Sequence, residues 1–174
     1  MTDTITYDQI ERYEYDNLFE LVDNRTNVPD PRNRPSTKPY VYDYDPLDSV
    51  EESVDFNVFP HIVVGLPFEV SESNKSVSGS IKRYTWKHTI TVRASRRGAG
   101  NNKPAAKGRN DMNDISSSLH KFFNTPSIRK SFRDVKMENI VFNKISSDTN
   151  VYNSTEYYEA EFELEFSVRL TVIA

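Results

Sequence analysis

The strongest pattern in the chain is an alternation of apolar and polar residues over positions 157–172. A period of two is typical of a strand with one face on a core and the other toward solvent. The inward set is Tyr158, Ala160, Phe162, Leu164, Phe166, Val168, Leu170 and Val172. The outward set contains four successive glutamates, Glu159, Glu161, Glu163 and Glu165. Such a strand would span roughly 50 Å, longer than a small sheet needs, so we expect part of it to pair with another chain.

Other segments predict a sheet around this strand. Residues 81–95 alternate in the same way, with a basic outward face in place of an acidic one. Residues 59–70, with a proline near each end, and residues 135–145 are two further predicted strands. A serine-rich loop follows the first of these two, and residues 146–155 are predicted to be a turn-rich connection before the last strand.

Two helices are predicted from capping signals and apolar spacing. Thr6 followed by Gln9 matches a capping box, with isoleucines at the two staple positions, so a helix should cover residues 7–23 with its N-cap at Thr6. Apolar residues at three- and four-residue spacing predict a second helix from position 110 or 111 to just before Pro126.

A proline-rich segment, residues 25–57, separates the first helix from the sheet. It holds five of the nine prolines, so no regular element is expected there. One interpretation is a flexible linker or disordered insertion. The other is an extended arm that wraps a neighbouring chain, because aromatic residues at Tyr40, Tyr42 and Tyr44 give it area to bury.

These elements predict an α+β fold: a mainly antiparallel four-stranded sheet with two helices packed on one face, plus the extended proline-rich arm. At 174 residues the chain should form a single domain. We divide it into an N-terminal helix (6–24), the arm (25–57) and the sheet with the second helix (58–174).

Composition narrows the function classes. The absence of cysteine excludes disulfides and thiolate metal sites. A net charge of −4 argues against a general nucleic-acid coat, although a local basic patch remains compatible with it. No stretch approaches eighteen apolar residues, so we expect a soluble chain with no membrane partner.

Catalysis and metal binding have little support. The three histidines, His61, His88 and His120, lack metal-ligand spacing, and no phosphate-binding or nucleophile-elbow motif is present. Asp134 and Lys136 match only the end of a restriction-like nuclease motif. We therefore predict a protein that is not an enzyme, with no catalytic residues, no metal site and no cofactor.

The charged residues leave two interpretations open. The four glutamates either pair across the sheet with Arg83, Lys87 and Arg93, or line a channel through which DNA slides without sticking. The predicted loop over residues 96–109 is either a solvated connection or a contact for acidic partners or phosphates. Its five cations are Arg96, Arg97, Lys103, Lys107 and Arg109.

Three stretches carry a resemblance to a known family: "FPHIVVGLPFEV", "IKRYTWKHTITVRAS" and "SIRKSFRDVKMENIVFNKISSDTNVYNSTEYYEAEFELEFSVRLTV". In these stretches and in the order of its elements, the chain resembles the tail terminator or tail-completion proteins of long-tailed bacteriophages and their archaeal relatives. The resemblance covers the chain apart from residues 25–57, a segment longer than the family's pattern.

The resemblance implies a structural virion protein that forms a ring, generally a hexamer, at the end of the tail tube. Its implied partners are other copies of itself, the tail tube protein, the head connector and other neck proteins, and DNA that passes the lumen without specific binding. Its implied location is the tail or neck of the virion, assembled in the host cytoplasm. The alternatives are a head-closure adaptor or other neck protein, a DNA-binding module, and a metal-dependent nuclease.

Overall fold

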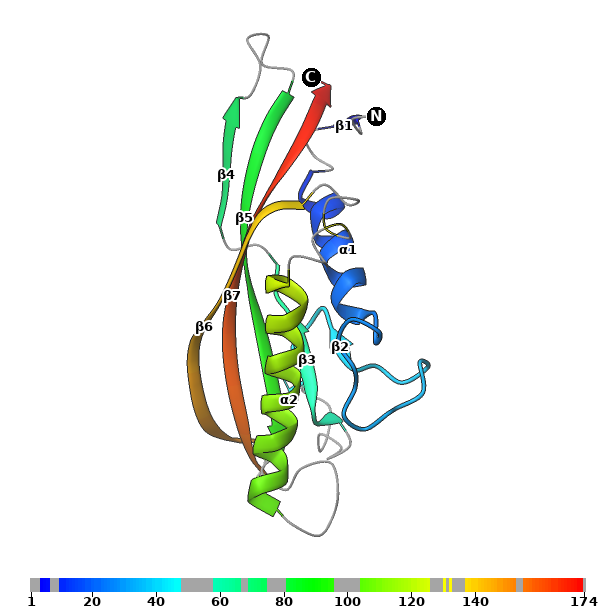
Figure 1. Cartoon of the computed structure of the whole chain (residues 1–174), viewed down its shortest axis with the longest axis vertical. Helices are drawn as coiled ribbons and strands as arrows, with labels where there is room; N and C mark the ends of the chain where they lie inside the picture. The colour runs from blue at the N-terminus through cyan, green and yellow to red at the C-terminus, as the bar shows by residue number, and fades with distance from the viewer. Residues whose placement is uncertain are drawn as a thin grey trace.

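Two helices lie against one seven-stranded mixed sheet (Figure 1). The computed structural model describes residues 4–6, 10–47, 58–66, 69–74, 81–95, 104–125, 130, 132, 137–152 and 155–173. In chain order the elements are β1 (Thr4–Thr6), α1 (Ile10–Asp23), β2 (Val41–Tyr42), β3 (His61–Val64), β4 (Glu69–Asn74), β5 (Ile81–Ser95), α2 (Pro104–Asn124), β6 (Met137–Tyr152) and β7 (Thr155–Ile173). The predicted α+β class is confirmed.

The long strands β5 and β7 form the centre of the sheet. They pair antiparallel along the whole of β5, from Ile81 opposite Thr171 to Ser95 opposite Tyr157. Strands β3 and β4 follow one another along the outer edge of β5, while β6 and β1 share the outer edge of β7. The sheet has seven strands in place of the predicted four, and the mainly antiparallel arrangement includes two short parallel pairs, β1–β7 and β2–β3.

Both helices cover the same face of the sheet, as predicted. The inward residues of β7 from Ala160 to Phe166 are fully buried in one cluster with Leu119 of α2 and Leu18 of α1. Tyr15 of α1 donates a hydrogen bond to the carbonyl of Val64 on β3, at 2.7 Å. Each large apolar side chain buried here stabilises the fold by roughly 1.5–3 kcal/mol, so this face contributes most of the folding energy.

The strand predicted over residues 59–70 is divided into β3 and β4. At the break, the Gly65 amide donates to the Thr89 carbonyl at 2.9 Å, and the Gly65 carbonyl lies 2.9 Å from His88 Nδ1. A Cβ at position 65 would lie 3.1 Å from the Thr89 oxygen. Glycine therefore allows the chain to approach β5 closely at the point where it leaves one register and enters the next.

The hairpin of β6 and β7 is longer than predicted. Residues up to Tyr152 continue β6 and pair with β7 as far as Thr155, so the predicted turn-rich connection is mostly strand. This part of β6 is an edge strand whose consecutive residues Ser147, Asp148 and Thr149 are all exposed and polar. It therefore lacks the apolar–polar alternation by which a half-buried strand is predicted. Pairing with β7, rather than side-chain pattern, determines this strand.

The predicted N-cap at Thr6 coincides with the last residue of β1, and residues 7–9, where the predicted helix would begin, lie outside the described residues. Residues Thr4–Thr6 form β1, which runs parallel to Thr171–Ile173 at the end of β7, and α1 is described from Ile10 onward. The two ends of the chain therefore lie side by side at one end of the sheet (Figure 1).

The proline-rich segment contains a regular element and folds onto its own chain. Val41 and Tyr42 form β2, parallel to β3, which contradicts the expectation of no regular structure in residues 25–57. Val28, Tyr40 and Val41 are buried in the main core. Residues 48–57 of this segment lie outside the described residues.

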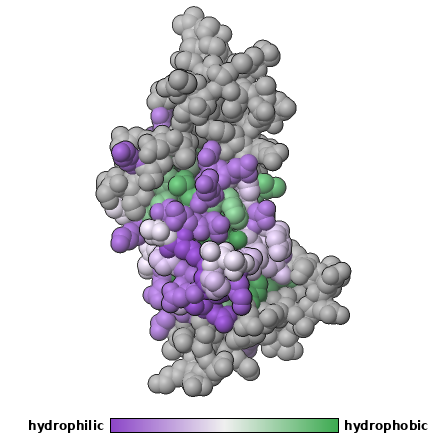
Figure 2. Space-filling model, turned by 90° about the vertical axis from the view of Figure 1, so that its right-hand side faces the viewer, coloured by the Kyte–Doolittle hydropathy of each residue, from purple (hydrophilic) through white to green (hydrophobic). Residues whose placement is uncertain are grey.

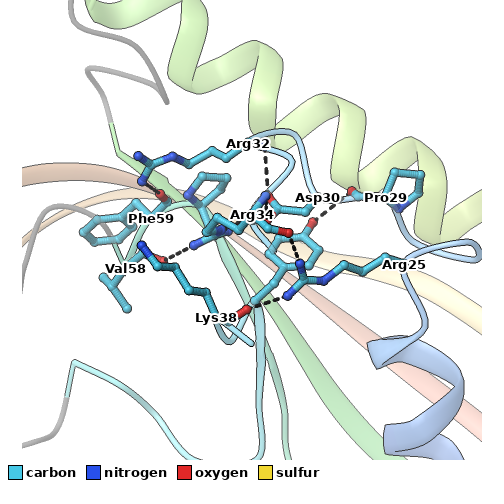
Figure 3. A network of polar contacts seen from close by, with 10 residues as sticks. Arg25, Pro29, Asp30, Arg32, Arg34, Lys38, Val58 and Phe59 are labelled. Carbon is cyan, nitrogen blue, oxygen red and sulfur yellow. Dashed lines mark hydrogen bonds and ion pairs between the residues drawn. The ribbon is translucent and has the colours of Figure 1, made fainter. Parts of the chain in front are cut away.

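Arginines join the proline-rich segment to the residues that precede β3 (Figure 3). Asp30 is buried and accepts hydrogen bonds from Arg34 Nε, at 2.7 Å, and from the Arg32 amide, at 2.9 Å. Arg32 donates in turn to the Phe59 carbonyl at 3.1 Å, and Arg25 donates to the carbonyl of Arg34. Guanidinium donors therefore satisfy backbone carbonyls both within this segment and in the residues before β3.

A second, smaller apolar cluster lies on the opposite face of the sheet. It consists of Leu47, Phe59 and Tyr157, with Val58 packed against it. The rings of Phe59 and Tyr157 stack with centroids 5.5 Å apart. Tyr157 belongs to the outward set of β7, so its burial shows that the chain around Leu47 covers one end of this face.

Candidate interaction surfaces

The row of glutamates lies on the side of the sheet opposite the helices. We call this side the open face and define it by the odd-numbered residues 83–93 of β5 and 159–167 of β7. Each of the four glutamates is partly exposed, while the residues between them are fully buried. Across the β5–β7 ladder, Glu159 faces Arg93, Glu161 faces Thr91, Glu163 faces Thr89 and Glu165 faces Lys87.

Ion pairs neutralise both ends of this row. Arg93 Nε lies 2.6 Å from Glu159 Oε2, and Lys87 Nζ lies 3.9 Å from Glu165 Oε2. Arg83 is 3.5 Å from Glu138 of β6. The interpretation in which glutamates pair across the sheet therefore describes Glu159 and Glu165.

Arg93 also holds the segment after β2 against the open face. Its guanidinium donates to both carboxylate oxygens of Asp45, at 2.6 and 2.9 Å, and lies 5.9 Å from the centre of the Tyr157 ring. Burial alone would raise the pKa of Asp45, but hydrogen bonds from Arg93 and from the Leu47 amide lower it. The result is a bidentate, partly buried pair, which is the strong form of a charged contact.

The two glutamates at the centre of the row are not neutralised as those at its ends are. Among the described residues, Glu161 and Glu163 have neither a hydrogen-bond partner nor an ion-pair partner. Threonines oppose them on β5, and Ser146 and Asn143 oppose them on β6. Three cations of this face are already paired, so its centre has a surplus of negative charge.

The predicted basic loop is partly helical. The helix α2 begins at Pro104, so Lys107 and Arg109 lie in it, which corrects the single loop predicted over residues 96–109. Proline is favoured at the first helical position, and the two alanines that follow are strong helix formers. Arg109 is exposed, with its guanidinium carbon 5.5 Å from the Tyr158 ring centre. Arg96, Arg97 and Lys103 lie outside the described residues.

The three tyrosines of the proline-rich segment have separate environments. Tyr40 is fully buried, its hydroxyl donates to the Pro29 carbonyl at 3.4 Å, and Arg34 lies over its ring. Its contacts are within its own chain, which corrects its assignment to a neighbour. Tyr42 is half-buried in β2, and Tyr44 is 59% exposed and contacts Tyr42 edge to face. Tyr44 stays a candidate for a contact between chains.

The histidines occupy aromatic surroundings. The His88 ring stacks on Phe166 with centroids 5.6 Å apart, and the His120 ring lies edge-on to Phe162. His61 is fully buried next to Phe59, and neither of its ring nitrogens has a hydrogen-bond partner in the described part of the chain. No group of three potential metal ligands occurs among the described residues, and Asp134 and Lys136 lie outside them.

The two arginine-centred clusters, around Asp30 and around Asp45, were not predicted from the sequence. Asp30 and Arg34 are four residues apart, which is the only local signal of their pairing. Arg93 was placed on the outward basic face, but its bond to Asp45 joins residues 48 positions apart. Contacts of that separation leave no periodic trace in a single sequence.

The side of the molecule on which α1 lies is mostly hydrophilic wherever residues are described, with small hydrophobic areas between hydrophilic ones (Figure 2). Larger exposed apolar side chains include Val141 and Ile145 of β6, Leu66 and Tyr44. Within the described residues, no helix has the length and apolar character required to cross a membrane.

No family model matches the chain, and no curated protein matches it either. Functional inference therefore rests on the residues and surfaces above.

Proposed function

We propose that the chain is a structural virion protein: a tail terminator whose ring caps the tail tube and joins it to the head connector. The observation that carries this proposal is the two-sided sheet. Strands β5 and β7 pair along the full length of β5, with helices on one face and a charged open face on the other. A rigid unit with two chemically different sides can repeat head to tail, and such contacts close into rings.

Two further features support the same role. The sequence resembles tail terminator proteins in the order of its elements and in the three stretches named above. The outer edge of β6 has no strand partner among the described residues and exposes Val141 and Ile145. In the proposed ring this edge is available to the tube protein or to a neck component, since an exposed edge strand with apolar side chains is a site for pairing.

The first test is the state of the purified protein. We expect a native mass of six times 20.2 kDa and a ring with a central opening in negative-stain images. A monomer at every concentration tested would contradict the proposal.

The second test separates a terminator from another neck protein. Tube protein that polymerises in vitro should stop growing when the ring is added, and the capped tubes should join heads. A protein that binds heads but leaves tube growth unchanged would be a head-closure adaptor instead.

A further inference from the structure

The open face and the outward surface of α2 carry opposite charge on opposite sides of the same chain. We infer that they contact each other between neighbouring copies: Glu161 and Glu163 of one copy lie against Arg109 and Lys121 on α2 of the next. This inference rests on the proposed ring and names the contact that closes it.

The acidic side of this contact is unneutralised within the described residues. Arg93 and Lys87 are paired with the two outer glutamates of the row, and no described cation reaches Glu161 or Glu163. Asp148, exposed on β6 and opposite Glu159, adds a further negative charge to this face. Like charges this close favour a cationic partner over solvent alone.

The basic side is the outward surface of α2. Among the α2 residues whose side chains are described, the exposed ones are polar and include two cations and one acid: Arg109, Asn110, Asn113, Asp114, Ser117, Lys121 and Asn124. The first turn of α2 has no acidic residue, so the positive end of the helix dipole is not compensated there.

The two surfaces cannot meet within one chain. Glu161 lies between Ala160 and Phe162, which are fully buried on the helix-covered side. Arg109 lies over Tyr158, which belongs to the same buried set. The sheet therefore separates the acidic centre from α2, and their charges can be matched only when a second copy presents its helix. A contact between two different patches is heterologous, the type that generates rings.

The two glutamates of the contact fit within the span of the two cations. Glu161 and Glu163 are about 7 Å apart along β7 at the rise of a strand. Arg109 and Lys121 are about 18 Å apart along the axis of α2. The threonine hydroxyls of β5 and the exposed asparagines of α2 can hydrogen-bond in the space between the charges.

Charge exchange between two variants tests the contact. In the first variant, Glu161→Lys with Glu163→Lys, the open face becomes positive. In the second, Arg109→Glu with Lys121→Glu, the helix becomes negative. At moderate salt each variant alone should lose the ring and sediment as a monomer, because each presents like charges at every contact.

An equal mixture of the two variants should form rings again. In an alternating ring, the positive face meets the negative helix at one contact, and the unaltered face meets the unaltered helix at the next. Only a heterologous contact between these two surfaces predicts restoration by mixing, and restoration also shows that both variants are folded. The matched control is Glu20→Lys with Asp23→Lys on exposed positions of α1, which changes the charge equally and should leave the ring intact.

Each other result overturns the inference in a recognisable way. If both variants form rings alone, or if the mixture stays monomeric, the contact lies elsewhere, and the proposed ring function stands. Should the first variant keep the ring but fail to join heads and tails, the glutamates face another neck component or the lumen. If the unmodified protein forms no ring, the proposed function fails along with the inference. Should the first variant not fold, Glu161→Gln with Glu163→Gln must instead weaken the ring, and an unweakened ring would refute the contact.

Discussion

The two sides of β7 come from one alternating sequence but contribute differently to the molecule. On one side, Phe162 and Phe166 are fully buried in the core with both helices. On the other side, Glu161 and Glu163 remain partly exposed and lack an ion-pair partner among the described residues. A buried aromatic side chain stabilises a fold by roughly 1.5–3 kcal/mol, whereas an exposed ion pair contributes at most about 1 kcal/mol.

Because of this difference, one face of β7 stabilises the fold and the other is available for contacts. The helix-covered face has little tolerance for change because its side chains are close-packed. The centre of the open face can vary with little effect on the fold, so its charge is free to serve a contact. The ends of the open face are an exception, because Arg93 fastens the segment around Asp45 there.

The largest effect should come from the core side of β7. Phe162 stacks on Phe142 with centroids 4.9 Å apart and is fully buried. We expect Phe162→Ala to lower the free energy of unfolding by about 3–5 kcal/mol, because it removes apolar contacts and leaves a cavity. Urea unfolding followed by fluorescence of the single, buried Trp86 measures this. A loss under about 1 kcal/mol would show that the core side of β7 contributes no more to stability than its open side, and Phe162→Leu is the milder control.

Removing one partner of a buried ion pair should destabilise the fold much as removing a core side chain does, and far more than removing a charge from the open face. Removing Asp30 in Asp30→Ala leaves the Arg34 guanidinium, whose side chain is only 9% exposed, without its carboxylate. We expect a loss of about 3 kcal/mol, since a buried charge without its partner is strongly destabilising. The control is Asp43→Ala at an exposed position, which should stay within about 0.5 kcal/mol. Thermal denaturation of the two variants measures both losses, and equal losses would contradict the prediction.

The buried His61 should make stability fall with acidity. Burial, together with the nearby Arg93 cation, lowers the pKa of His61 to about 3 in spite of smaller effects of Val58 and Asp45 that raise it. The unfolded chain, with an ordinary histidine pKa near 6.5, therefore binds the proton first as the pH decreases. Stability should fall by up to about 1.4 kcal/mol per pH unit between pH 6.5 and 4.

Replacing this histidine isolates its contribution. In His61→Phe the acid-dependent loss over that pH window should be reduced, because no group at position 61 then titrates. Melting temperatures from pH 7 to pH 4 for both proteins provide the measurement. The lowered pKa of Asp45 affects stability only below about pH 4, where that carboxylate takes up its proton. Parallel pH profiles for the two proteins would refute the role of His61.

The smallest effect should come from the centre of the open face. Glu161→Gln with Glu163→Gln removes two charges that have no described partner. At a concentration where the chain is monomeric, the free energy of unfolding should change by less than about 0.5 kcal/mol. A loss comparable to that of Phe162→Ala would show that these carboxylates stabilise the fold, and the separation drawn between the two sides would be wrong.

Patterns with a local cause were predictable. The period of two in β5 and β7 follows from one face being buried, so the inward and outward sets could be assigned residue by residue. Both helices were predicted from their apolar spacing, although α2 begins earlier than predicted because Pro104 and the alanines after it were assigned to a loop. The proline content of residues 25–57 indicated an irregular segment but did not indicate which parts of the chain it contacts.

The α+β class, the faces of the two central strands and the position of the four glutamates therefore follow from the residue pattern alone. Three contacts become visible only in the folded chain: β1 pairs with the end of β7, Tyr40 lies in the core of its own chain, and Arg93 binds Asp45. Periodicity records whether a residue faces solvent or core, which is a property of its own element. Partners far along the chain are brought together only when the whole sheet forms, and they leave no repeat that a single sequence displays.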